Sequence, residues 1–137
     1  MKIIGFSQLR NELEKGNLEN WFKCMSVCDY IYIFDQNSTD GSQDFYKTIP
    51  NTVVVESNKN RFNEEISCKS ELLNKILKDH PDVDWIFWMD GDTLLDNRLL
   101  ENNGKRFKEM CRQGTFERVD AFLFGHYNLW KIGRAHV

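Results

Sequence analysis

One stretch of nine residues, 84–92, constrains the fold more than any other, and it reads Asp-Trp-Ile-Phe-Trp-Met-Asp-Gly-Asp. Its compact run of apolar and aromatic residues is typical of a β-strand that is buried on both faces. The run ends in two carboxylates, Asp90 and Asp92, which flank Gly91. In open α/β sheets ligands bind beyond the carboxyl ends of the strands. Such a strand would therefore deliver two acids to a ligand-binding edge.

The acid pair also indicates what the ligand contains. Two carboxylates this close repel each other, and a hard divalent cation such as Mg²⁺ or Mn²⁺ would relieve the repulsion because it prefers oxygen ligands. Gly91 would let the backbone turn and a ligand approach closely. We therefore expect Asp90 and Asp92 to bind a metal. The alternative is a solvated turn in which an aspartate caps the following helix.

Composition excludes several classes of protein. The 137 residues are 41% hydrophobic and 28% charged, which is typical of one soluble globular domain. The formal charge of −3 argues against a nucleic-acid partner. The sequence contains no apolar run near the roughly 20 residues that span a bilayer, and its apolar start is too short for a signal peptide. We expect a cytoplasmic protein, free or peripheral to the inner membrane face.

Apolar and turn-forming segments alternate along the chain in a pattern that predicts an α/β fold. Strands are expected at residues 2–6, 30–34, 52–56, 85–89 and 119–124, with a further extended segment at 127–130. Helices are expected at residues 18–27, 42–46, 64–80 and from 97 toward 111, with a break near Gly104 and with Asn17, Ser42, Asn63 and Asp96 as caps. The third helix would bury Ile66, Leu72, Leu73, Ile76 and Leu77.

Strands that alternate with helices favour a mostly parallel sheet with right-handed crossovers. The second and fourth strands would then end at the same edge of that sheet. Asp35, which follows the second strand, should therefore face one crevice together with Asp90 and Asp92.

Three motifs resemble those of family 2 glycosyltransferases and follow one another in the same order. Residues 35–42, Asp-Gln-Asn-Ser-Thr-Asp-Gly-Ser, resemble the family's Asp-Asp-Gly-Ser-Thr-Asp-Gly-Thr segment. Asp90-Gly91-Asp92 resembles its Asp-x-Asp motif, and Arg10-Asn11-Glu12 is similar to a variant among its relatives. The likeness covers residues 2–96. It implies a Rossmann-like GT-A fold over residues 1–131, with three α/β/α layers, a mostly parallel sheet and an incomplete C-terminus.

The resemblance also implies a function, namely metal-dependent transfer of a sugar from a nucleoside diphosphate to an unknown glycan, lipid-linked or protein acceptor. Mn²⁺ or Mg²⁺ would hold the donor diphosphate. Asp92 would be the direct ligand, and Asp90 would contact the metal, its water or the ribose. The remaining carried-over roles are nucleobase or ribose contact for Asp35, the base pocket for Arg10 and Asn11, and a nucleotide-facing cation for Lys69.

Two features separate the sequence from the family pattern. Gln36 stands where the family has a second acid, although its amide can still donate and accept hydrogen bonds. The family's catalytic base would lie beyond the end of this chain. Residues 132–137, Ile-Gly-Arg-Ala-His-Val, resemble a translated sequencing adapter. We therefore expect a gene cut at about Lys131, so that the chain is the front part of a longer protein.

Other interpretations remain open at this point. Residues 90–96 also resemble the nucleophile loop of haloacid-dehalogenase phosphatases, in which the first acid attacks phosphorus and the second is the acid/base. The glycine that follows the second acid in that loop is missing here. A catalytically incomplete nucleotide-binding fragment is a further alternative. Individually, Asp35 could form a turn at a strand end, Arg10 a surface charge and Lys69 a solvated helix position.

Overall fold

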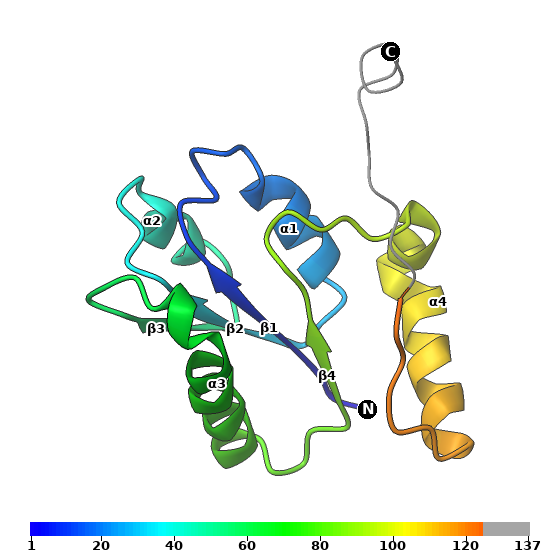
Figure 1. The fold of residues 1–137 in the computed structure, drawn as a ribbon. Coiled ribbons are helices and arrows are strands. Elements are labelled where there is room, and N and C mark those ends of the chain that lie inside the picture. The colour runs from blue at the N-terminus through cyan, green and yellow to red at the C-terminus, as the bar shows by residue number, and fades with distance from the viewer. Residues whose placement is uncertain (125–137) are drawn as a thin grey trace, which may run out of the picture.

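Four parallel strands lie at the centre of the described part of the chain, in the order β3-β2-β1-β4 (Figure 1). The structure is a computed structural model, and it describes residues 1–124. The strands are β1 (Ile3–Leu9), β2 (Tyr30–Asp35), β3 (Thr52–Glu56) and β4 (Trp85–Trp88). All three strand pairings are parallel. The expected α/β class with a parallel, Rossmann-like sheet is confirmed.

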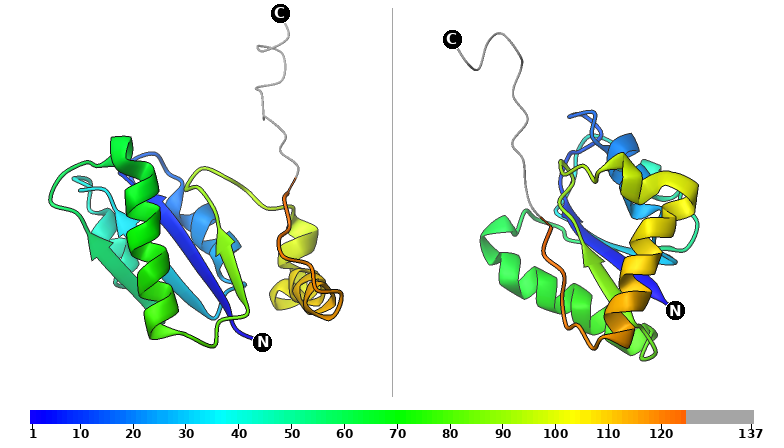
Figure 2. Two further views of the ribbon diagram at one scale, coloured as in Figure 1. Left: turned by 60° about the horizontal axis from the view of Figure 1, so that its bottom comes forward. Right: turned by 90° about the vertical axis from the view of Figure 1, so that its right-hand side faces the viewer.

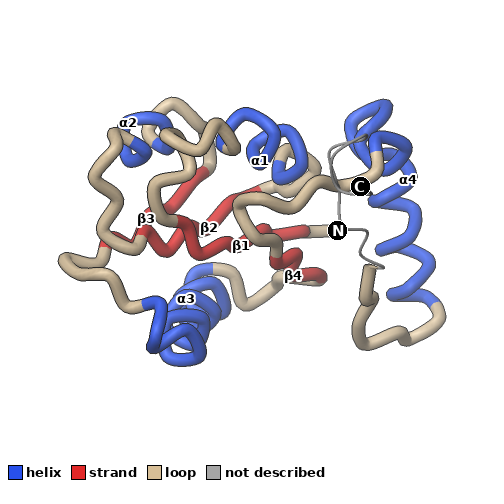
Figure 3. Tube along the Cα trace, turned by 45° about the horizontal axis from the view of Figure 1, so that its top comes forward, coloured by secondary structure: helices blue, strands red, loops and turns tan. Residues whose placement is uncertain are grey.

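Helices cover both faces of the sheet. They are α1 (Leu18–Met25), α2 (Ser42–Tyr46), α3 (Glu65–Asp79) after the 3₁₀ turn η1 (Phe62–Glu64), and α4 (Asn97–Phe116). Helices α1 and α2 lie on one face and α3 on the other (Figure 3), whereas α4 lies beside β4 (Figure 2). Within residues 1–124, no helix combines the length and the apolar character that crossing a membrane requires.

The alternation of side chains along the strands divides the core in two. In β2, the odd-numbered Ile31 and Ile33 pack with α1, α2 and α4, and the even-numbered Tyr32 and Phe34 pack with α3. The α3 side buries Cys68, Leu72 and Ile76. Ile66 was expected on the same side, but it is 82% exposed, and Leu77 is exposed as well. Helical spacing alone therefore overestimated the width of the apolar face of α3.

The register of the strands places their carboxyl ends at one edge. Leu9 of β1 pairs with Asp35 of β2, and Phe6 of β1 pairs with Trp88 of β4. Beyond that pair the Ser7 hydroxyl donates to the Met89 carbonyl over 2.6 Å. The ends of β2 and β4 therefore lie at the same edge, as expected, with the end of β1 between them.

Two expectations about strands are wrong. Residues 119–124 form no strand; Phe122 and Phe124 pack through their rings instead, with Phe122 stacked at 5.3 Å from Trp85. β4 was expected to be buried on both faces, but of its four side chains only Phe87 is buried, and Trp88 at its end is 42% exposed; within the described residues β4 is also the edge strand. The expected extended segment at 127–130 and the tail at 132–137 lie outside the described residues.

The helix boundaries follow the expected signals with local differences. Asp96 caps α4 by accepting from the Arg98 N–H, and α4 is broken at residues 101–104, as predicted. Gly104 has a φ of 72° and lies so close to Val27 that a Cβ would come within 2.6 Å of it. The caps at the other helices differ: Asn17 makes no side-chain cap bond, Gly41 precedes α2, and Glu64 rather than Asn63 precedes α3.

Candidate functional site

The acid pair lies on the loop that leaves the carboxyl end of β4. Asp90 and Asp92 are both exposed, whereas Gly91 between them is buried. A Cβ at Gly91 would come within 2.8 Å of the Glu12 carboxyl carbon and 2.9 Å of Leu9. The glycine is therefore required by close packing, and this packing fixes the backbone from which the two carboxylates extend.

Glu12 is a residue that sequence reasoning did not assign to the site. It is buried, its carboxylate accepts a 2.7 Å hydrogen bond from the Asn17 amide, and it lies 3.6 Å from the Lys15 ammonium. Its carboxyl group lies against Gly91. The only sequence signal for it was its place in the Arg10-Asn11-Glu12 motif. Glu12 thus packs against the turn that carries Asp90 and Asp92 and helps to fix its backbone.

The donor chemistry of this loop suits a hard cation. Asp90 and Asp92 offer the carboxylate oxygens that Mg²⁺ and Mn²⁺ prefer. Among residues 1–124, however, no three His, Cys, Asp or Glu side chains form a group that could hold a metal ion. Mg²⁺ is commonly bound through one or two carboxylates, with waters and substrate phosphates completing its shell. The residues present fit a cation of that kind.

Asp35 lies at the expected edge but faces no crevice, because it is completely buried. Its carboxylate accepts hydrogen bonds from the Ser38 N–H (3.0 Å), the Ser38 hydroxyl (2.6 Å), the Gln43 amide (3.0 Å) and the Tyr46 hydroxyl (3.3 Å). Burial, together with the Asp35 charge, raises the pKa of Tyr46 well above its usual range. The bonding of Asp35 is that of a turn-forming residue at a strand end.

Arg10 and Asn11 join the loop after β1 to the loop after β2. The Arg10 guanidinium donates to the carbonyl oxygens of residues 36–37. The Asn11 N–H donates to the Ser38 hydroxyl over 3.0 Å, and the Asn11 amide oxygen accepts from the Thr39 N–H over 2.7 Å. These bonds close the two loops on each other. Arg10 and Asn11 are therefore not arranged as the lining of an open base pocket.

Lys69 of α3 lies beside the carboxyl end of β4. Its ammonium is 2.9 Å from the Glu65 carboxylate and 3.6 Å from the centre of the Trp88 ring. Trp88 is the last residue of β4 and precedes Asp90 by two positions. The structure thus brings this predicted cation beside the strand that carries the acids.

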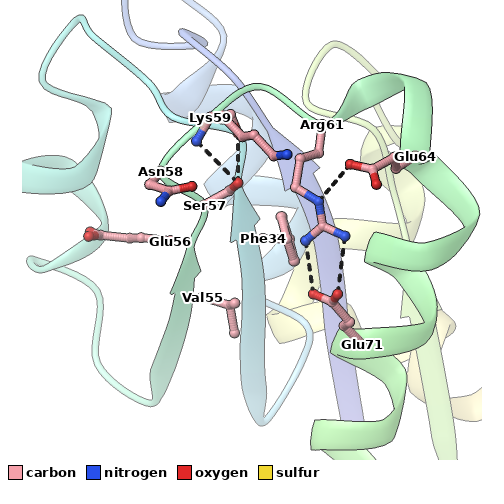
Figure 4. Close-up of a pocket in the computed structure, with 9 residues that line it drawn as sticks. All are labelled: Phe34, Val55, Glu56, Ser57, Asn58, Lys59, Arg61, Glu64 and Glu71. Atoms are coloured by element: carbon pink, nitrogen blue, oxygen red, sulfur yellow. Dashed lines mark hydrogen bonds and ion pairs between the residues drawn. The ribbon is translucent and has the colours of Figure 1, made fainter.

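A cleft of about 530 Å³ opens at the carboxyl ends of β2 and β3, next to α3 (Figure 4). Arg61 forms one wall; it donates to Glu71 through both terminal nitrogens (3.3 and 3.2 Å) and to Glu64 over 2.9 Å. These two carboxylates, Glu71 first, raise its pKa above the usual range for arginine. Its guanidinium lies over the Phe34 ring at 5.8 Å. Sequence reasoning missed this cleft because no motif marks Arg61.

A buried polar chain connects the cleft to the middle of the sheet. The Gln36 amide oxygen accepts a 2.7 Å hydrogen bond from the backbone N–H of Arg61. The Gln36 NH₂ group donates to the Gln8 amide oxygen over 3.1 Å. Gln8 in turn donates to the Glu65 carbonyl over 3.2 Å. Gln36 must donate and accept at once, which a carboxylate cannot do. The glutamine at position 36, where the family 2 pattern has an acid, therefore has a structural reason.

Comparison with known proteins supports one enzyme class. The family model of the galactosyl transferase GMA12/MNN10 family matches residues 45–109, a segment that runs from α2 through β3, α3, β4 and the acid pair into α4. A search of the curated proteins found no match. The family match supports a glycosyltransferase, with a sugar donor and an acceptor, but it does not indicate family 2. Over the segment that carries Asp90 and Asp92, the chain is thus similar to a glycosyltransferase family.

Proposed function

We propose that this chain carries the donor-binding part of a glycosyltransferase that moves a sugar from a nucleoside diphosphate to an acceptor. The proposal depends on one observation above all. Two exposed carboxylates, Asp90 and Asp92, follow a parallel strand at the carboxyl edge of the sheet, within the segment that matches a glycosyltransferase family. Ligands bind at that edge in open α/β sheets.

In this proposal Asp92 binds Mn²⁺ or Mg²⁺ directly, and Asp90 binds the metal, its water or the donor ribose. The cation would supply positive charge to the diphosphate of the donor. The chain's own contribution is to hold the acids. The contact of Gly91 with Leu9 and Glu12 fixes the backbone at the turn. The ligand phosphates would complete a metal shell that these two side chains begin.

The other residues that were expected to bind the sugar donor act less directly in this proposal. Lys69, beside Trp88, would attract the anionic donor, although Glu65 already balances part of its charge. The polar groups of Arg10, Asn11 and Asp35 are used in bonds between loops and within them. We propose that these three residues serve donor binding by holding those loops in place.

Calorimetric titration with nucleoside diphosphates, in the presence and absence of Mn²⁺, tests the proposal. We expect Mn²⁺-dependent binding that Asp92→Asn weakens by about 100-fold or more, since it removes a direct ligand and one charge. Asp44→Asn is the matched control, because Asp44 is an exposed aspartate of α2 that forms an ion pair with Lys47. It should bind as the wild type does.

Two outcomes would contradict the proposal. One is nucleotide binding that is unchanged by Mn²⁺ or by Asp92→Asn in a protein that keeps its melting temperature. The other is rapid release of phosphate from simple phosphate esters that depends on Asp90 and Asp92, which would favour the phosphatase alternative.

A further inference from the structure

We propose that the cleft beside Arg61 binds the nucleobase of the donor, in place of the loop residues Arg10, Asn11 and Asp35. This inference rests on the proposed function, and it reassigns one part of that site. Those three residues are bonded to protein groups, and Asp35 is completely buried. The cleft, by contrast, is an open volume of about 530 Å³ at the same edge of the sheet.

The lining of the cleft suits a flat, uncharged ring better than a phosphate. Phe34 and Val55 form its apolar part, whereas Ser57, Asn58 and Lys59 bring hydroxyl, amide and ammonium groups to its rim (Figure 4). Its charged members are two cations and three acids, namely Lys59, Arg61, Glu56, Glu64 and Glu71. An excess of acids disfavours an anion. Apolar and polar groups together suit a base, which has flat faces and a hydrogen-bonding edge.

The state of Arg61 strengthens this argument. Its N–H groups donate to the carboxylates of Glu64 and Glu71, so a phosphate would have to compete with two existing ion pairs. These pairs hold the guanidinium over the Phe34 ring, in the wall of the cleft. Arginine stacks readily on flat π-systems. The structure thus favours Arg61 as a stacking surface rather than as a phosphate ligand.

The distance across the sheet also agrees. β4 ends at Trp88, which pairs with Phe6, so Asp90 leaves the sheet at the carboxyl edge at which the cleft also opens. From β4 across β1 to the boundary of β2 and β3 is about 12 Å at the usual strand spacing. This is comparable to the span from the base to the second phosphate of an extended nucleoside diphosphate. Gln8 and Gln36 lie between the two positions, where they are buried and bonded to each other, and so form the floor of the sheet edge rather than a ligand contact.

Two ligands separate this inference from the proposed function. A nucleoside diphosphate carries a base, and inorganic pyrophosphate does not. Arg61→Lys keeps the charge but loses the flat plane, and Val55→Phe fills the cleft without removing Arg61. We expect each variant to weaken binding of the nucleoside diphosphate by about three- to ten-fold in the presence of Mn²⁺. Pyrophosphate affinity should stay within about two-fold of the wild type, because the acid pair is untouched.

Lys75→Gln is the matched control. Lys75 is a cation of α3, as Arg61 is a cation next to α3. It forms an ion pair with Asp79 and does not line the cleft. It should bind both ligands as the wild type does. If both cleft variants keep full nucleoside diphosphate affinity, or lose pyrophosphate affinity equally, the base does not lie here although the donor site stands. If the wild type binds neither ligand with Mn²⁺, the proposed function and this inference both fail.

Discussion

The carboxyl edge of the sheet has two halves that are built in opposite ways. After β1 and β2, the loops at residues 10–14 and 35–43 bond to each other, and the carboxylate at their centre, Asp35, is completely buried. After β4, Asp90 and Asp92 are exposed, and the tight contact is made by the glycine between them. Both halves carry acids at strand ends, yet only one presents them at the surface.

This difference shows what an acid at a strand end is used for. Buried polar groups in proteins are almost always satisfied by other protein groups, and Asp35 with its four donors follows that rule. Asp90 and Asp92, by contrast, are exposed to solvent at the strand end, where a ligand could reach them. The sequence motif made the two halves look alike, and burial shows that Asp35 holds its loop, whereas Asp90 and Asp92 are the acids to which we assign ligand binding in our proposal.

Asp35→Ala should disrupt the half of the edge after β1 and β2, where the two loops bond to each other. It has the largest expected effect. It leaves Ser38, Gln43 and Tyr46 donors without their buried acceptor, so we expect the free energy of unfolding to fall by about 3–4 kcal/mol. Urea unfolding followed by circular dichroism measures this. Asp44→Ala, an exposed aspartate at α2, is the control and should change stability by less than about 0.5 kcal/mol. A similar loss in both variants would show that the bonding of Asp35 contributes little.

Gly91→Ala should act on the other half with a smaller cost. The added methyl would meet Leu9 and the bonded, buried Glu12 at under 3 Å, and displacing them should cost about 1–3 kcal/mol. We also expect weaker Mn²⁺-dependent binding of nucleoside diphosphates, because the turn that carries Asp90 and Asp92 must shift. Calorimetry and urea unfolding measure the two effects separately.

Gly114→Ala serves as the matched control for that substitution. A Cβ at Gly114 would come within 2.7 Å of Phe122, a comparable clash next to β4 but on α4. It should destabilise the protein without changing the affinity of the folded form for the nucleotide. Equal losses of affinity in the two variants would mean that Gly91 affects binding through general stability alone.

Much of the fold could be predicted because strands and helix caps are local signals. The β-branched and aromatic runs gave the strands β2 and β3, and Asp96 with Gly104 gave the start and the break of α4. The apolar pattern at residues 119–124 wrongly predicted a strand, because Phe122 and Phe124 pack by their rings without joining the sheet. Ring packing and backbone pairing produce similar apolar sequences.

The site was less predictable, because the partners of a polar residue depend on the tertiary fold. The acids Asp90 and Asp92 stood out by sequence alone. The support of Gly91 by Glu12 joins the loops after β4 and β1, and the burial of Asp35 depends on the loop after β1 closing over its own loop. No local pattern encodes these contacts between loops that are distant in sequence. The residues that the motif assigned correctly to the edge were therefore not always those that face a ligand.

The smallest expected effect concerns the charge that follows the acid pair, at Asp96. The Arg98 guanidinium and then its N–H donate to this carboxylate and lower its pKa from the usual 3.8 to about 2. A carboxyl group whose pKa is lower in the folded state stabilises that state above its unfolded pKa, and the effect is lost as the pH falls toward the folded pKa.

Asp96→Asn keeps a good cap but removes the charge. We therefore expect it to melt slightly below the wild type at about pH 6, with a difference that shrinks between about pH 4 and pH 2. Arg98→Gln, which removes the partner instead, should show the same pH dependence. A difference that is constant down to about pH 2 would mean that the carboxylate acts only as a hydrogen-bonding cap and that its charge contributes nothing.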